Sequence, residues 1–194
     1  MPPKPKFTRG EIVAAALAIV SDSGADALTA KRLGEALGCS ASPIFTVFSS
    51  MGEIQQEVRQ AAMSRFEAYA HRAGGDMPAF KQVGMQMILF AREEPQLYQL
   101  IFMSANSGVT PFDDHYAYLG GVADECLSAI QADYGLSAAE AETLFEHTWI
   151  HTFGIGALCA TGACSFSTEQ ISHMLTQDFT AMLMLLKGCR EETL

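Results

Sequence analysis

The sequence has almost none of the alternation between apolar and polar residues that predicts β-strands, and helix signals dominate it. No apolar run approaches the ~20 residues that span a bilayer, and the N-terminal Met-Pro-Pro-Lys-Pro-Lys lacks the apolar segment of a secretory signal. The five cysteines form no Cys-x-x-Cys pair and no disulfide framework. We therefore expect an all-α, cytoplasmic protein with reduced thiols.

Catalytic patterns are also scarce. The chain shows no Ser/His/Asp arrangement, no glycine-rich phosphate loop and no complete set of metal ligands. Glu146, His147 and His151 have a helical spacing that can place two imidazoles on one metal, and His115 and Cys159 are candidates for a further ligand. A metal-dependent enzyme or a metal sensor is therefore the alternative hypothesis. The simpler interpretation, polar groups lining a pocket or an interface, predicts no enzyme and no cofactor.

Positive charge is in short supply, because the formal net charge is −10. Residues 1–48 carry five basic and four acidic side chains, a balance of +1, whereas the remainder has seven basic and eighteen acidic ones, a balance of −11. A DNA-binding head on an acidic body would show this distribution. The electrostatic part of DNA affinity grows with each phosphate neutralised, so we expect weak non-specific binding unless the protein dimerises.

Residues 29–48 predict two short helices joined by a tight turn. Thr29 can cap the first helix, and Leu33 and Leu37 lie on its apolar face. Gly38 permits the left-handed backbone that ends a helix before a sharp turn.

The second of these helices begins at Ser40 or Ser42 and tolerates Pro43 in its first turn. Ile44 and Phe48 are four residues apart and are expected to anchor it inward. Two helices joined in this way form the helix-turn-helix that reads the DNA major groove.

Four sequences with Ser or Thr followed three residues later by Glu or Gln predict capped helix starts, at 8–11, 50–53, 137–140 and 167–170. Together with the apolar spacing they predict about nine helices, with a break at 74–76 and a loop at 105–111. The expected architecture is an N-terminal three-helix head with the helix-turn-helix (1–52), a connecting fourth helix (53–73) and a C-terminal helical ligand-binding and dimerisation body (74–194).

The motifs within this order resemble those of the TetR family of bacterial transcriptional regulators. Leu37-Gly38-Cys39-Ser40 is similar to the usual ending of the family's second helix, and residues 44–48 (Ile-Phe-Thr-Val-Phe) resemble its Leu-Tyr-x-x-Phe reading helix. Residues 90–102 and 149–162 resemble stretches of the family's ligand domains. The resemblance implies a homodimer whose last two helices form a four-helix bundle. It also implies a repressor that a small-molecule effector releases from double-stranded operator DNA.

The expected DNA-binding residues depart from the family in two respects: the reading helix has no Lys or Arg, and Phe45 stands where the family has Tyr. Base contacts then fall to small polar residues and apolar groups, and phosphate contacts to helix N-termini and the basic arm of Lys4, Lys6 and Arg9. The predicted set is Lys6, Thr29, Lys31, Ser40, Ala41, Ser42, Phe45 and Thr46. A TetR-like protein that no longer binds DNA remains an alternative.

Two further sets of residues lie in the predicted body. Methionine and aromatic side chains adapt to varied ligands, so the expected wall of the effector pocket is Met87, Phe90, Tyr98, Phe102, Tyr118, Trp149 and Phe153. Small residues allow close helix approach, so the expected dimer interface is Gly156, Ala160, Ile171, Leu175, Phe179 and Met182.

Overall fold

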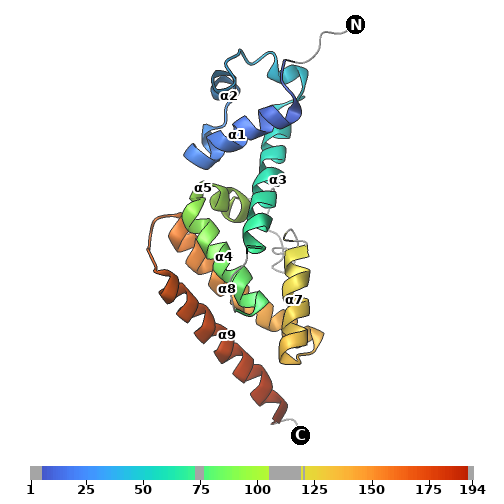
Figure 1. The fold of residues 1–194 in the computed structure, drawn as a ribbon, viewed down its shortest axis with the longest axis vertical. Coiled ribbons are helices and arrows are strands. Elements are labelled where there is room, and N and C mark those ends of the chain that lie inside the picture. The colour runs from blue at the N-terminus through green and yellow to red at the C-terminus, as the bar shows by residue number, and fades with distance from the viewer. Residues whose placement is uncertain (1–5, 73–76, 105–118, 120, 192–194) are drawn as a thin grey trace. The chain divides into compact units, whose positions relative to one another are not determined.

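The computed structural model describes residues 6–72, 77–104, 119 and 121–191, and over these residues it is all-helical (Figure 1). The predicted all-α class is confirmed, with eight α-helices in the described part of the chain against about nine expected. The elements are α1 (Arg9–Ser23), η1 (Ala25–Ala27), α2 (Ala30–Ala36), η2 (Ile44–Thr46), α3 (Met51–Ala70), α4 (Ala79–Glu93), α5 (Pro95–Tyr98), η3 (Gln99–Met103), α7 (Gly121–Tyr134), α8 (Ala138–Ala160) and α9 (Thr168–Glu191).

The chain divides into two compact units. The head unit contains the described residues of Met1–Phe66 and Glu94–Ser104, and the body unit those of Glu67–Glu93 and Ala105–Leu194. The head unit is thus discontinuous in sequence, because α5 and η3 belong to it although α4 does not. The domain boundaries expected at residues 52 and 73 stay predictions.

Helix starts follow the capping chemistry closely. The Thr8 hydroxyl accepts the Glu11 backbone N–H at 3.2 Å, and the Glu11 carboxylate accepts the Thr8 N–H at 2.8 Å. Ser137 with Glu140 and Ser167 with Gln170 repeat this exchange at α8 and α9. Each exchange satisfies two backbone donors that the helix itself leaves unpaired.

At α3 the predicted capping box is shifted by one residue. Ser50 Oγ accepts the Glu53 N–H at 3.2 Å, but the Glu53 carboxylate accepts the N–H of Ser49, at 2.7 Å. Arg9 adds an ion pair to Glu53 at 2.8 Å and a second to Glu57 at 2.6 Å, with its guanidinium 4.2 Å from the centre of the Phe48 ring. The start of α1 is therefore held against α3.

α5 and η3 are attached to the rest of the head unit by two arginines of α3. Arg59 donates to the backbone carbonyls of Leu100 at 2.6 Å and Ile101 at 2.7 Å, within the π-helical turn η3. Arg65 pairs with the buried carboxylate of Glu94, which also accepts the Ser21 hydroxyl at 2.8 Å. These bonds satisfy polar groups that would otherwise be buried at a cost.

The body unit is built around α8, which packs against α4, α7 and α9. A buried apolar cluster of Met85, Ile88, Ile155, Ile171 and Leu175 joins α4, α8 and α9. The final helix, whose start at 167–170 was predicted from its capping residues, runs to Glu191. α7 is described from Gly121, and the loop predicted at 105–111 and the residues up to 118 lie outside the described part.

Candidate nucleic-acid interface and ligand cavity

The turn after α2 depends on two glycines. Gly38 has a φ of +62°, so the predicted left-handed backbone at this position is confirmed. Gly34 is buried where the Cys39 N–H donates to its carbonyl at 2.8 Å. A Cβ on Gly34 would lie only 2.7 Å from the Cys39 carbonyl oxygen, so the turn closes onto α2 at a distance that only glycine accommodates.

The segment after the turn is shorter and tighter than the helix expected from the sequence. Only Ile44–Thr46 forms a helical turn, of 3₁₀ type, and the Ala41 carbonyl accepts the N–H groups of Ile44 at 3.1 Å and Phe45 at 3.4 Å. Ile44 and Thr46 are β-branched, and such residues favour helix less than unbranched ones do. The inward anchors are as predicted, because Ile44 and Phe48 are 0% and 1% exposed.

Most of the predicted DNA-binding residues are accessible to solvent. Ala41 is half-buried, and the other seven are exposed: Lys6, Thr29, Lys31, Ser40, Ser42, Phe45 and Thr46. Phe45 is 42% exposed, and the Thr46 hydroxyl donates to the Pro43 carbonyl at 2.6 Å. This part of the head unit therefore presents small polar groups and one aromatic ring to solvent.

The charged residues near this surface are partly engaged within the head unit. Lys31 lies 4.0 Å from Glu35, Arg32 donates to Ser23 at 2.7 Å, and the Thr29 hydroxyl caps α2 through the Arg32 N–H. Arg9, expected in the phosphate-binding arm, is held by Glu53 and Glu57. Most of the positive charge available to a polyanion in the described head thus comes from Lys6, Lys31 and Arg32.

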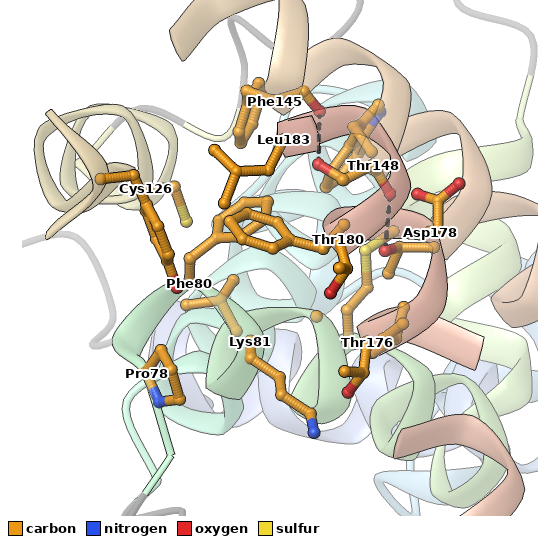
Figure 2. Close-up of a pocket in the computed structure, with 18 of the residues that line it drawn as sticks. Pro78, Phe80, Lys81, Cys126, Phe145, Thr148, Thr176, Asp178, Thr180 and Leu183 are labelled. Carbon is orange, nitrogen blue, oxygen red and sulfur yellow. Dashed lines mark hydrogen bonds between the residues drawn. The ribbon is translucent and has the colours of Figure 1, made fainter. Parts of the chain in front are cut away.

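A cavity of about 320 Å³ lies within the body unit, between α4, α7, α8 and α9 (Figure 2). Five aromatic side chains form much of its wall, namely Phe80, Tyr134, Phe145, Trp149 and Phe179. The Phe179 ring centre lies 5.6 Å from that of Phe80 and 4.8 Å from that of Tyr134.

The polar groups deep in this wall are mostly neutral and internally bonded. The Thr148 hydroxyl donates to the Leu144 carbonyl at 2.7 Å, and the Thr152 hydroxyl donates to the Thr148 carbonyl at the same distance. Burial raises the pKa of the Cys126 thiol to about 12, so the thiol is neutral near pH 7. The cavity therefore suits an apolar ligand body.

Known proteins resemble this chain in structure but not detectably in sequence. No protein-family model matches the chain, and no curated protein is detectably similar to it in sequence. Among solved structures, it is similar to a proposed TetR-family transcriptional regulator from Vibrio parahaemolyticus, with a TM-score of 0.61 and 16% identity over 89% of this chain and 97% of the other. It is also similar to one from Mesorhizobium loti, with a TM-score of 0.58 and 17% identity over 94% of this chain and 98% of the other. The fold is that of the TetR-family regulators.

Within this TetR fold, the residues predicted for the effector pocket separate into several groups. Met87 and Trp149 line the cavity, and Phe90 is fully buried with its ring centre 5.0 Å from that of Tyr69. Tyr98 and Phe102 pack together in the head unit with ring centres 4.7 Å apart. Phe153 is half-buried on α8, and Tyr118 lies outside the described residues.

The residues predicted for the dimer interface lie in the body unit. Gly156, Ala160, Ile171 and Leu175 are buried, Met182 is half-buried, and Leu175 and Phe179 line the cavity. Large apolar side chains that are exposed on α8 and α9 were not predicted for this role: Ile150 at 54%, Leu158 at 40%, Met184 at 70% and Leu185 at 58%.

The cavity residues of α4 and α8 that sequence reasoning missed share a helical spacing with the two that it predicted, Met87 and Trp149. Phe80, Val83, Gly84 and Met87 of α4 recur at i, i+3, i+4 and i+7, and Phe145, Thr148, Trp149 and Thr152 of α8 recur in the same way. That spacing marks one face of a helix. Paired threonines within an otherwise apolar face of α8 were the available signal.

The metal hypothesis gains no further ligand from the described residues, which contain no group of three His, Cys, Asp or Glu placed to hold a metal. His151 Nδ1 lies 3.8 Å from the carboxylate of Asp178, and His147 is exposed. His115 lies outside the described residues. None of the helices as described is long and apolar enough to cross a membrane.

Proposed function

We propose that this protein is a homodimeric transcriptional repressor that binds operator DNA through residues 40–46 and is released by a small molecule. The observation that carries the proposal is the accessible surface of Ser40, Ser42, Phe45 and Thr46, set on a segment that the buried Ile44 anchors. Hydroxyls can bond either base edges or phosphates, and an exposed ring can contact thymine methyl groups. The TetR fold supports this assignment.

The direct test is binding of the pure protein to its own upstream DNA over a series of salt concentrations. We expect binding tighter than to random DNA, weakening as salt rises, because neutralised phosphates release counterions. Thr46→Glu should abolish this binding, since a carboxylate in the groove faces the phosphate backbone. Ala139→Glu adds the same charge at an exposed position in the first turn of α8 and should bind DNA as the unchanged protein does.

Equal binding by both variants would mean that residues 40–46 do not contact DNA. Affinity no greater than for random DNA, across the upstream region and other genomic fragments, would favour a TetR-like protein without DNA binding.

The dimer is proposed from the last two helices. Ile150 and Leu158 on α8 and Met184 and Leu185 on α9 are exposed within one chain, and several large apolar groups on neighbouring helices favour burial by a partner. Together with the small residues of α8, they suit the isologous contact of a two-fold dimer. A dimer would set two reading segments roughly 34–36 Å apart, in successive major grooves. Light scattering should give the mass of two chains per particle, and Ile150→Lys should shift the measured mass toward that of a single chain.

The effector is proposed to occupy the cavity of the body unit. A volume of about 320 Å³ falls at the lower end of small-molecule sites. A ligand shifts a conformational equilibrium only by its different affinity for the two states, so this role requires the DNA-bound and released forms to differ at the cavity. Reduced operator affinity in the presence of a cavity ligand would support the assignment.

A further inference from the structure

The charges at the cavity are few and lie at its edges. Among the described residues that line the cavity, two side chains are charged, Lys81 of α4 and Asp178 of α9. Figure 2 shows them at separate places around the cavity, with the amino group of Lys81 at the lower edge of the lining side chains. A bound molecule with one polar end therefore meets a different charge depending on its orientation.

The two charges differ in what they already face. Asp178 Oδ1 lies 3.8 Å from Nδ1 of His151 on α8. Lys81 makes no ion pair with any carboxylate that the structure describes. Lys81 also lies in the first turn of α4, where the aligned peptide dipoles add positive potential, and that turn itself contains no acidic residue. Lys81, rather than Asp178, is thus the charged side chain at the cavity that lacks an oppositely charged partner among the described residues. A bound anion is therefore favoured beside Lys81.

The inner wall of the cavity determines which chemistry is favoured for the part of the ligand that lies away from Lys81. Thr148 and Thr152 are each only 5% exposed, and both hydroxyl protons already bond helix carbonyls. A ligand polar group placed beside them would find acceptors rather than free donors, and burying it without a full set of partners costs free energy. A ligand with an apolar body inside the cavity and an anionic end at its edge would therefore match both parts of the wall.

We propose that the effector class is an amphipathic monocarboxylate, such as a medium-chain fatty acid, with its apolar body among the aromatic rings and its carboxylate at Lys81. This proposal rests on the cavity being the effector site of the proposed function. The volume of about 320 Å³ limits the class to molecules of modest size.

The chain carries its own reporter for the test, because Trp149 lines the cavity and is the single tryptophan of the sequence. Three probes share one alkyl chain and differ in the end group: decanoate, decan-1-ol and decyltrimethylammonium. Each is titrated near pH 7.5 into the full chain while Trp149 emission is recorded, and calorimetry repeats each titration. We expect decanoate to bind most tightly.

Two lysine variants separate a specific contact from overall charge. Lys81→Met should weaken decanoate binding about tenfold and leave decan-1-ol unchanged, because only the carboxylate loses a charged partner. Lys81→Arg should restore decanoate binding. Lys187→Met removes the same charge from an exposed position of α9 that does not line the cavity, and should leave decanoate binding unchanged.

Other outcomes overturn the proposal. Tighter binding of decyltrimethylammonium, lost in Asp178→Asn, would make the ligand class cationic. Equal effects of Lys81→Met and Lys187→Met would mean that Lys81 does not hold the carboxylate. No binding of any probe by either measurement would remove the ligand class, whatever the DNA experiments show. Decanoate that binds through Lys81 yet leaves operator DNA bound would instead contradict the proposed release, with the ligand class still supported.

Discussion

The close approach at Gly34 makes a prediction about the helix-turn-helix. Gly34→Ala adds a Cβ whose nearest neighbour, the Cys39 carbonyl oxygen, is 2.7 Å away, with the Ser40 carbonyl carbon at 3.4 Å. Both neighbours are backbone atoms, so no side chain can rotate to make room. The turn must open, and the 2.8 Å hydrogen bond from the Cys39 N–H to the Gly34 carbonyl must lengthen or break.

Gly10→Ala is the matched control for this change. Gly10 is also helical, in α1, but its Cβ would meet nothing within 4 Å. Replacing a helical glycine by alanine generally stabilises by about 0.5–1 kcal/mol, and forcing an extra methyl group into a packed site costs about 1–3 kcal/mol. The gain applies to both variants, so Gly34→Ala should be about 1–3 kcal/mol less stable than Gly10→Ala.

The assay is denaturant unfolding of the two variants beside the unchanged protein, read by circular dichroism. Thermal melting gives a second measure, because 1 kcal/mol shifts the Tm by about 2–4 °C in a chain of this size. Under conditions where each variant is folded, Gly34→Ala should also lose operator affinity relative to Gly10→Ala. Equal stability of the variants, or a more stable Gly34→Ala, would refute the inference that the turn requires glycine.

Three further predictions concern the packing and ion pairs of the two units. Hydrogen bonds from the Ser49 N–H and hydroxyl, and then from Arg9, lower the pKa of Glu53 to about 2. The contribution of Glu53 to stability is therefore present above about pH 4.5 and is lost as the pH falls through 2. Glu53→Gln should flatten the acid unfolding profile between these two pH values. Glu94→Gln should cost about 1–2 kcal/mol of unfolding free energy, between values for exposed and buried pairs, and Arg65→Met should add little to it in a double-mutant cycle. Phe90→Ala, at a site with no exposure, should lower the unfolding free energy by about 3–5 kcal/mol in urea titrations.

Local chemistry explains which features could be predicted from the sequence. The start of α1 depends on two residues three apart, Thr8 and Glu11, whose partners lie within one helical turn. The burial of Ile44 and Phe48 likewise follows from their spacing on a single turn. Such features need no knowledge of the remote chain, and the structure has them as predicted.

The cavity was harder to predict because helical spacing shows which face of a helix is apolar, not what covers it. Tyr98 and Phe102 have the same spacing and composition as wall residues, yet they pack in the head unit. The spacing of Leu175 and Phe179 is equally compatible with a dimer interface and with a cavity wall, and in the structure both residues line the cavity. Long-range packing decides between such equivalent apolar surfaces.

The segment of residues 94–104 has a consequence for how the protein is made. Its buried side chains, among them Tyr98 and Phe102, complete the head unit, and the Phe102 ring meets that of Phe66 with centres 5.1 Å apart. During synthesis, domains generally fold from the N-terminus as units. Here the first 66 residues emerge without these partners, and the ribosome must translate all of α4 before the head can close. Until then, the apolar surface of the nascent head stays exposed to solvent. A fragment that ends after α3 lacks residues 94–104, so its apolar surface would remain exposed.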